Sequence, residues 1–423
     1  MLRQKHLDLC QLIVDAGGTP FVVGGFVRDM LLGRQPKDVD VMVVGASNEL
    51  CRLLHKHGEL VGDSFPVWKI VTDHGDVEVA LARTEQKTDD GQGYKGFDCQ
   101  TEDVTLEQDL QRRDLTINAM AMDPFTGKVF DPFRGARDLA DGVLRPVGAH
   151  FGEDPLRVLR AARFAAQLGM VLSDELVEVA QVVLPELITL PGERLWGELE
   201  KALRTPKPSL FFEALDKLGA LEVVLPEIDA LQGRTQPEKY HPEGDAYVHT
   251  LEVVDRAAEL GADDETMFAA LTHDLGKAVT DDDNLPHHYN HEALGVPLVH
   301  DMCDRLRVPN THRKVAAVTA KDHLNVHRFD DLKPVKKVRL LMRLLAVQGD
   351  QMLSRVVLAS KADARGRGPL HANDPYEQGD RLLKAAGVIR QVRGHEFAHL
   401  KDGQKIAQNM ERARAKALKG AGF

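Results

Sequence analysis

The sequence has few cysteines and few aromatic residues, and it contains no long apolar run. Its four cysteines, Cys10, Cys51, Cys99 and Cys303, lie far apart and in no metal-ligand spacing. This usage is typical of reduced thiols in a cytosolic protein and excludes a disulfide framework. No apolar run approaches the roughly 18 residues that span a bilayer. Residues 1–18 have the pattern of an amphipathic helix without a small-residue cleavage site, so we expect a cytoplasmic protein with no signal peptide and no membrane segment.

An excess of positive charge is also absent. Lys and Arg number 54 against 65 Asp and Glu, and the net charge of −11 excludes a protein that is basic over its whole surface. A local basic groove for nucleic acid is compatible with that total. Hydrophobic residues make up 43% and charged residues 28% of the 423 positions, which excludes wholesale disorder. This length predicts two to four domains.

The apolar periodicity changes once along the chain. Short β-branched runs with period two occur up to about residue 145, at 21–23, 39–44 and 76–82. From Asp154 onward, apolar residues recur three and four apart, which indicates helices. We therefore predict an α+β head followed by an all-α neck, body and tail. The predicted domain limits are 1–145, 146–235, 236–370 and 371–423.

A glycine turn and two acidic residues in the head suggest a metal site for a phosphate-bearing substrate. Gly24 and Gly25 follow a strand and open a helix, where the backbone can approach a phosphate. Asp38 and Asp40 lie two apart on the next strand, so both carboxylates point to one face. Such oxygen ligands suit Mg²⁺, which bridges to substrate phosphates. Taken alone, the glycine motif is better explained by a plain tight turn and the aspartate motif by a solvated pair at a strand end; it is their combination that favours a functional site.

Together these residues resemble the signature of the DNA polymerase β-like nucleotidyltransferases, in particular the class II CCA-adding tRNA nucleotidyltransferases. Further motifs of that family follow in the same order over nearly two hundred residues: Arg112-Arg113-Asp114 to Ala119; Asp131-Pro132-Phe133 with Gly135 and Asp138; Glu153-Asp154 with Arg157, Arg160 and Arg163; and Glu193-Arg194 with Glu198.

The resemblance implies roles for these residues. Asp38 and Asp40 would be catalytic and would hold Mg²⁺, and Glu78 is the candidate third carboxylate, although a surface strand glutamate explains it nearly as well. Asp154 and Arg157, three apart on a helix, would present donors and acceptors to the base of CTP or ATP. The nucleotide-binding set would be Gly25, Arg28, Arg113, Asp114, Asp154, Arg157, Arg160 and Arg163. The stretch 89–94 would be a mobile loop that helps the switch from C to A addition.

The body is rich in histidine and resembles an HD phosphohydrolase domain, as in the bacterial multifunctional type of CCA enzyme. The resemblance implies a metal site of His249, His273, Asp274 and Asp363, with His273 and Asp274 catalytic. We expect His273 and Asp274 inside a helix, and His288, His291 and His323 as second-site ligands or phosphate contacts. His241 and His287 stay unassigned as loop residues. The metal would be a second divalent ion, Ni²⁺ or Mg²⁺, and an inactive HD fold is the alternative.

The resulting hypothesis is template-independent addition of CCA to the 3′ end of tRNA from CTP and ATP. The HD domain would add 2′,3′-cyclic phosphodiesterase, 2′-nucleotidase or phosphatase activity. The basic tail and the run 336–339 could contact tRNA phosphates, and a solvated helix face is an equal interpretation of each. We expect a monomer or homodimer. The alternatives are a poly(A) polymerase, which shares the head motifs, and a tRNA-binding protein whose catalytic head has decayed.

Overall fold

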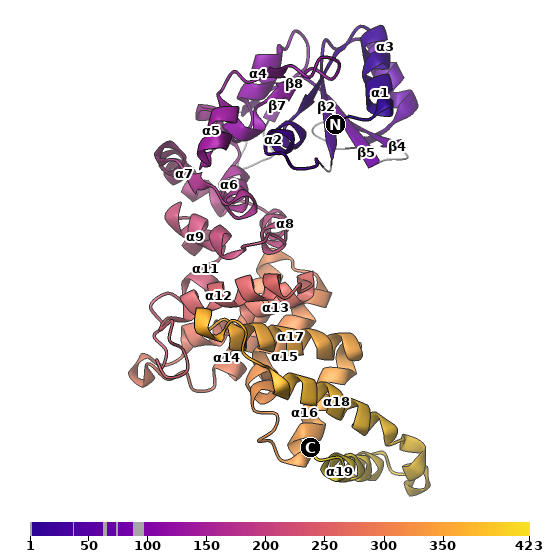
Figure 1. Cartoon of the computed structure of the whole chain (residues 1–423), viewed down its shortest axis with the longest axis vertical. Helices are drawn as coiled ribbons and strands as arrows, with labels where there is room; N and C mark the ends of the chain where they lie inside the picture. Colours follow the sequence, from indigo (N-terminus) through magenta and orange to yellow (C-terminus); the bar gives the residue numbers. More distant parts are fainter. Residues whose placement is uncertain (1, 37, 62–65, 73–74, 88–96) are drawn as a thin grey trace. The chain divides into compact units, whose positions relative to one another are not determined.

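The computed structural model describes residues 2–36, 38–61, 66–72, 75–87 and 97–423 (Figure 1). The chain forms two compact units. The first contains Met1–Leu190 and Lys217–Ala220, and the second contains Pro191–Asp216 and Leu221–Phe423. The four domain limits drawn from the sequence stay a prediction. The expected fold class is confirmed, because all the strands described lie before residue 173 and the remainder of the chain is helical.

Seven strands among the described residues of the first unit form one mixed sheet, in the order β3-β4-β5-β2-β1-β8-β9. Their bounds are β1 Thr19–Val23, β2 Val39–Val44, β3 Glu59–Val61, β4 Val67–Thr72, β5 Gly75–Leu81, β8 Ala121–Met122 and β9 Val129–Phe130. β2 and β5 are parallel, and the other neighbours are antiparallel. β6 Thr84–Lys87 pairs with β7 Phe97–Gln100, and β10 Val143–Leu144 pairs with β11 Val171–Leu172.

Helices pack against the sheet and continue beyond it. They are α1 Gln4–Asp15, α2 Gly25–Leu31, α3 Asn48–His57, α4 Leu106–Gln111, α5 Gly135–Asp141, α6 Leu156–Leu168 and α7 Asp174–Leu187, with the short 3-10 helices η2 Thr116–Asn118 and η3 Ala149–Glu153. α1 packs on β1 but is shorter than the stretch 1–18 suggested, because the chain turns at Gly17 with a φ of 85°.

β2 is the strand that positions the predicted carboxylates. Val41 and Val43 on one face are buried, and Val43 meets Ile13 and Leu50 around Gly18. Met42, on the other face, packs into the core with Val23 of β1. Because strand residues alternate between faces, Asp38 and Asp40 share the face of Met42. The apolar residues therefore fix the strand and deliver both carboxylates to the same side.

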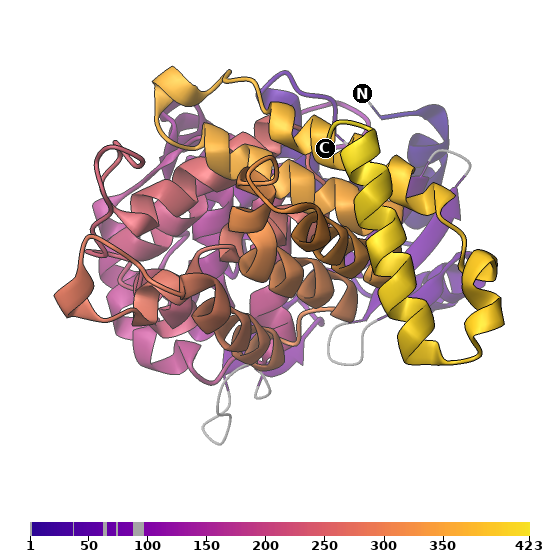
Figure 2. The ribbon, with the colours of Figure 1, turned by 90° about the horizontal axis from the view of Figure 1, so that it is seen from below.

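The second unit contains helices and no strand among its described residues. The helices are α8 Gly192–Leu203, α9 Ser209–Lys217, α10 Leu221–Val224, α11 Pro226–Asp229, α12 Ala246–Glu259, α13 Asp264–Thr272, α14 His291–Leu306, α15 Asn310–His327, α16 Pro334–Gln348, α17 Asp350–Arg365, α18 Glu377–Gln391 and α19 Gly403–Gly420, with the 3-10 helices η4 Leu275–Val279, η5 Asp282–Asn284, η6 Pro369–His371 and η7 Gly394–Leu400. α12, α13, α15 and α17 pack on one another, and α19 lies against α16 and α18 (Figure 2).

The expected helical position of His273 and Asp274 is wrong. α13 ends at Thr272, and Asp274 immediately precedes the 3-10 helix η4. Gly276 lies so close to α14 that a Cβ there would sit 1.9 Å from the carbonyl oxygen of His291. A residue with a side chain would therefore force the two elements apart. This tight turn places Asp274 beside the first residue of α14.

No helix in the described ranges is long and apolar enough to cross a membrane.

Candidate functional site

Acidic side chains meet at the start of β2. The parallel register pairs Asp40 with Glu78 of β5, and Asp38 immediately precedes β2. Asp40 is half-buried, whereas Asp38 and Glu78 are exposed. Burial raises the pKa of Asp40 to about 6, and the negative charges of Glu78 and Asp38 contribute to the rise. The three carboxylates that we predicted as metal ligands are thus close enough to repel one another.

The glycine turn and the Arg-Arg-Asp motif lie next to this carboxylate group. Gly24 has a φ of 64°, a conformation that favours glycine, and it precedes α2. A Cβ at Gly24 would lie 3.2 Å from Nη1 of Arg113. The positive charge of Arg113 also reaches Asp40, where it opposes the rise in pKa. The structure therefore brings the turn, the arginine and the carboxylates together, as the sequence predicted.

Asp109 of α4 organises the arginines and was not identified from the sequence. Its carboxylate is fully buried and lies 2.6 Å from Nη2 of Arg112 and 3.1 Å from Nη2 of Arg113. Burial alone would raise the pKa of Asp109, but Arg113 and Arg112 hold it below its usual range. The spacing of three and four residues from the acid to the two bases, across the end of α4, was the available signal.

A chain of polar contacts links α2, η2 and α6. Nη1 of Arg28 donates to Oδ1 of Asn118 at 2.8 Å, and Nδ2 of Asn118 donates to Asp114 at 3.0 Å. Nη2 of Arg160 lies 2.7 Å from Oδ2 of Asp114. Burial would raise the pKa of Asp114, but Arg160 and Asn118 lower it to about 2. Arg28, Asn118, Asp114 and Arg160, all of which belong to the motifs found in the sequence, are therefore joined in one hydrogen-bonded network.

The ring of Phe164 on α6 packs against two arginines of this network and against Arg163. The guanidinium groups of Arg28, Arg160 and Arg163 lie 5.2, 5.7 and 4.2 Å from its centroid. Such contacts hold planar cations in place without neutralising their charge. The side chains of Arg28 and Arg163 are mostly buried, and that of Arg160 is about one-third exposed. Two arginines of the predicted row, Arg160 and Arg163, are therefore held in place by this ring.

Asp154 and Arg157 do not share a helix face, contrary to the geometry that we expected. Asp154 lies before α6, where its Oδ1 accepts the N–H of Leu156 at 3.0 Å. The buried guanidinium of Arg157 donates to the carbonyl oxygens of His150 and Arg112. Their contact with a base stays a prediction. The predicted loop 89–94 lies outside the described residues.

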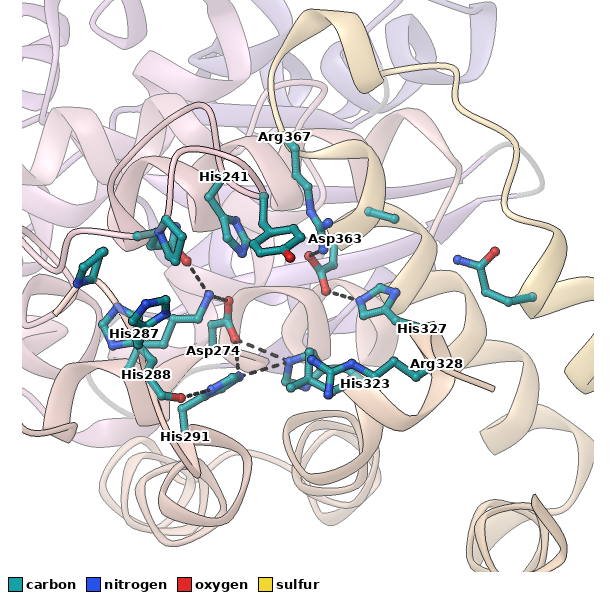
Figure 3. A pocket seen from close by; sticks show the side chains of 18 residues that line it. His241, Asp274, His287, His288, His291, His323, His327, Arg328, Asp363 and Arg367 are labelled. Carbon is teal, nitrogen blue, oxygen red and sulfur yellow. Dashed lines mark hydrogen bonds and ion pairs between the residues drawn. The ribbon is translucent and has the colours of Figure 1, made fainter. Parts of the chain in front are cut away.

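The HD residues converge in the second unit, and Figure 3 shows two of them, Asp274 and Asp363, at the wall of a pocket. Nε2 of His249 lies 3.1 Å from Oδ1 of Asp363, and Nε2 of His273 lies 3.1 Å from Oδ2 of Asp274. His249, His273 and Asp363 form a buried group whose ligand atoms all lie within 4.8 Å of one another. These four residues are the predicted metal ligands, and the structure brings all of them together.

Asp274, His291 and His323 form a second buried group of the same kind. Oδ1 of Asp274 lies 3.3 Å from Nε2 of His291 and 3.5 Å from Nε2 of His323. His288 differs, because its Nδ1 contacts the Thr280 hydroxyl at 2.6 Å and its Nε2 contacts the Thr235 carbonyl at 3.0 Å. His288 therefore has no ring nitrogen left for a metal, whereas His291 and His323 do.

Several residues of this site were missed or left unassigned in the sequence. Nζ of Lys277 lies 2.5 Å from Oδ2 of Asp274, and Nε2 of His327 lies 2.5 Å from Oδ2 of Asp363. Oε1 of Glu243 lies 2.7 Å from Nδ1 of His249 and 2.9 Å from Nδ1 of His241. Of these residues, only Lys277 could have been identified from the sequence, because it lies three residues after Asp274.

A cavity of about 510 Å³ opens onto these ligands. Lys277, Arg328 and Arg367 line it, together with Asp274, Asp363, Tyr240 and the histidines at 241, 287, 288, 291, 323 and 327. The cationic side chains make this lining suitable for an anionic substrate such as a phosphoester.

Comparison with known proteins agrees with this geometry. Three family models match in order: the Poly A polymerase head domain at residues 20–145, the probable RNA and SrmB-binding site of polymerase A at 169–232, and the HD domain at 246–367. The chain is 45% identical over 407 residues to the multifunctional CCA protein of Nitrosococcus oceani, covering 95% of this chain and 98% of that protein. It is also 45% identical over 410 residues to that of Vibrio vulnificus, with the same coverage.

The chain belongs to the family of multifunctional CCA proteins.

Solved structures show the same fold. The Bacillus stearothermophilus CCA-adding enzyme in complex with CTP superposes with a TM-score of 0.69 at 23% identity, covering 99% of this chain and 93% of that one. The Thermotoga maritima CCA-adding enzyme complexed with tRNA gives a TM-score of 0.64 at 20% identity, covering 99% and 92%. The family resemblance and the α+β fold class inferred from the motifs are thus confirmed.

The HD residues of this family member fit a divalent metal. Nδ1 of His273, His291 and His323 lies 2.8–3.1 Å from backbone carbonyl oxygens, which places the ring proton on Nδ1. Each Nε2 lone pair therefore faces a carboxylate, an arrangement that needs a cation. Nε2 of His273 and Oδ1 of Asp274 are buried and have no hydrogen-bond partner among the described residues.

In the metal-free protein, a proton on His249 supplies part of this positive charge. Burial would lower the pKa of His249, but Asp363 and Glu243 raise it to about 9. A metal that bound His249 would therefore displace a proton.

Proposed function

We propose that this protein adds C, C and A to the 3′ end of tRNA, using CTP and ATP and no nucleic-acid template for the added bases. The tRNA 3′-hydroxyl attacks the α-phosphorus of the nucleotide, the new O3′–P bond forms, and pyrophosphate leaves. The observation that carries the proposal is the cluster of Asp38, Asp40 and Glu78 beside the turn at Gly24 and the arginine network of α6. The 45% identity to multifunctional CCA proteins supports CCA as the product rather than a poly(A) tail.

Asp38 and Asp40 would hold Mg²⁺, with Glu78 as the third carboxylate. The raised pKa of Asp40, caused by burial and by neighbouring negative charge, marks a site that a cation would stabilise. When bound, Mg²⁺ supplies positive charge to the phosphate oxygens of the reacting nucleotide. The chain's own contribution is to hold the carboxylates on one face of β2 and β5.

The arginines would bind the triphosphate. Arg113 and Arg28 lie at the turn of Gly24 and Gly25. Arg160 is linked to Arg28 through Asp114 and Asn118, and Arg163 packs on the ring of Phe164. Arg160 is bound to Asp114 through two nitrogens and is the most exposed of the α6 arginines, so it can exchange that carboxylate for phosphate oxygens. Asp154 and Arg157 would hydrogen-bond the edge of the base. To do so, Arg157 would give up its hydrogen bonds to the carbonyl oxygens of His150 and Arg112.

An assay with trimmed tRNA tests this function. The chain is incubated with tRNA that lacks its 3′ end and with labelled CTP, ATP or both, and the products are sequenced. We expect C, C and A in that order, followed by arrest. A long A tail would instead identify a poly(A) polymerase, and no incorporation would identify a tRNA-binding protein with an inactive head.

We also propose that the HD site hydrolyses phosphoesters, in particular 2′,3′-cyclic phosphates, 2′-phosphates and phosphomonoesters of nucleotides. His249, His273, Asp274 and Asp363 would hold a divalent metal, either Ni²⁺ or Mg²⁺, and His291 and His323 would join Asp274 at a second position. When bound, the metal lowers the pKa of a coordinated water. Lys277, Arg328 and Arg367 would bind the substrate phosphate from the cavity wall.

Hydrolysis of 2′,3′-cyclic AMP, 2′-AMP and p-nitrophenyl phosphate, each with Ni²⁺ or with Mg²⁺, tests the HD site. We expect release of a phosphomonoester from the first substrate and of phosphate from the others. Absence of all three activities with either metal would favour the inactive HD fold.

For the partner tRNA, we propose that exposed basic residues of α19 contact backbone phosphates. Arg412, Lys416 and Lys419 lie on one exposed face of that helix. The run 336–339 is less suitable, because Lys337 is buried and Arg339 binds Glu411 at 2.9 Å. A cytoplasmic location follows from these substrates, and the choice between monomer and homodimer stays a prediction.

A further inference from the structure

We propose that Tyr376 and His327 are positioning residues of the HD site, which hold one oxygen of Asp363 so that its other oxygen faces the metal. This inference rests on the proposed phosphohydrolase function. It assigns a role to a residue of the C-terminal tail, which the sequence had separated from the HD domain at residue 370.

The three side chains form a continuous hydrogen-bonded row. The Tyr376 hydroxyl lies 2.9 Å from Nδ1 of His327, and Nε2 of His327 lies 2.5 Å from Oδ2 of Asp363. A carboxylate only accepts, so Nε2 carries the ring proton and Nδ1 accepts from the tyrosine hydroxyl. The polarity of the row is therefore fixed from Tyr376 to Asp363.

The row determines which oxygen of Asp363 is left for a metal. Oδ1 faces the predicted ligands, 3.1 Å from Nε2 of His249 and 4.0 Å from Nε2 of His273. Figure 3 shows His327 bound to the carboxylate of Asp363, through the other oxygen, Oδ2. With Oδ2 engaged, Asp363 offers a single oxygen to the metal. In other proteins, groups that hydrogen-bond the atom of a ligand side chain that does not face the metal alter metal affinity.

The packing around Tyr376 keeps the row rigid. Its side chain is 6% exposed, and its ring meets that of His327 edge to face at 5.7 Å. Gly379 leaves room for this ring against the first turn of α18, because a Cβ at that position would lie 2.7 Å from Cδ1 of Tyr376. His327 ends α15, Asp363 lies in α17, and Tyr376 precedes α18. Three elements thus converge on one carboxylate.

Tyr376 lies beyond the part of the chain that resembles other HD domains. The HD family model ends at residue 367, whereas Tyr376 and the cavity-lining Gln378 follow it. The tail therefore completes a site whose ligands come from the HD domain.

Metal affinity is the direct test. Ni²⁺ binding is measured by titration calorimetry on the full chain, in an Asp40→Asn background that removes the head's contribution. We expect His327→Ala to weaken Ni²⁺ binding about 10- to 100-fold, the range for groups that support a metal ligand. Tyr376→Phe should weaken it less, because Nε2 still donates. His327→Gln, whose amide can donate to Asp363, should restore part of the affinity lost in His327→Ala.

Hydrolysis of 2′,3′-cyclic AMP at increasing Ni²⁺ separates positioning from damage to the fold. In the row variants, saturating Ni²⁺ should return kcat to near the parent value, which an unfolded site would not permit. Tyr289→Phe and His300→Ala are matched controls, since both side chains are exposed and neither lines the cavity. Both should bind Ni²⁺ as the parent does.

The double variant decides whether Tyr376 acts through His327. Tyr376→Phe should have no further effect in the His327→Ala background. Parent-like Ni²⁺ affinity in His327→Ala, or equal effects of Tyr376→Phe with and without His327, would overturn the inference while the phosphohydrolase proposal stands. A parent chain that neither binds Ni²⁺ nor hydrolyses phosphoesters would refute the proposed function itself, and the inference with it.

Discussion

At the scale of the residue, Asp40 shows a conflict between stability and chemistry. Its pKa in the metal-free protein is raised to about 6 by burial and by Glu78 and Asp38. The unfolded chain has a value near 3.8, so folding disfavours the charged form. The resulting destabilisation is absent below about pH 4 and is complete above about pH 6. Such a cost is expected where carboxylates are gathered to bind a cation.

Asp40→Asn should therefore abolish nucleotide addition and stabilise the metal-free protein. We expect at least a 10³-fold loss of CTP incorporation and a gain of about 3 kcal/mol in the free energy of unfolding at pH 8, from the raised pKa. The gain should vanish near pH 4. Urea unfolding at both pH values, with and without Mg²⁺, measures it, and Mg²⁺ should stabilise the parent more than the variant. A variant less stable than the parent at pH 8 would contradict the repulsion.

Asp274→Asn should have the opposite effect on the two activities. The carboxylate contacts Lys277, His273 and His291, so its loss removes a proposed metal ligand and leaves the buried Lys277 without its carboxylate partner. We expect phosphoester hydrolysis to fall at least 10²-fold, while nucleotide addition to trimmed tRNA stays within about twofold of the parent. Both rates are measured on the same preparation. Parallel loss of both activities would contradict two independent sites.

At the scale of the element, spacing predicted strands better than the ends of helices. The period-two runs placed β1, β2 and β5 within a few residues, because buried valines fix both strand and register. The helix containing Asp154 and the helix containing His273 were both drawn too long. In each case a polar residue sits at a helix end, where local hydrogen bonds and tight packing override apolar periodicity.

The turn between α13 and α14 depends on Gly276. A Cβ would meet the carbonyl oxygen of His291 at 1.9 Å, so Gly276→Ala should displace η4 from α14 and separate Asp274 from His291. We expect a loss of about 1–3 kcal/mol in the free energy of unfolding and a loss of phosphoester hydrolysis. Gly387→Ala in α18 is the control, because a Cβ there meets nothing within 4 Å. Urea unfolding and hydrolysis by both variants provide the comparison, and equal behaviour would refute the packing argument.

At the scale of the whole molecule, the motifs identified the chemistry but not every residue that supports it. The order of motifs led to the family, and the residues predicted as metal ligands lie close together within each unit, while their role as ligands stays a prediction. Glu243, His327 and Tyr376 were not predicted, since each acts on a neighbour through a contact that only the folded chain creates. Positions that support a ligand have no fixed spacing from it, so one sequence gives no signal for them.

The central claim is that the carboxylates of β2 and the arginines of α6 bind a single nucleotide. A crystal structure of the chain with CTP and Mn²⁺, using the anomalous signal of manganese, tests it directly. We predict manganese at Asp38 and Asp40, the triphosphate on Arg113 and Arg160, and the cytosine edge at Asp154 and Arg157. CTP bound elsewhere, or manganese located away from Asp38 and Asp40, would contradict the account.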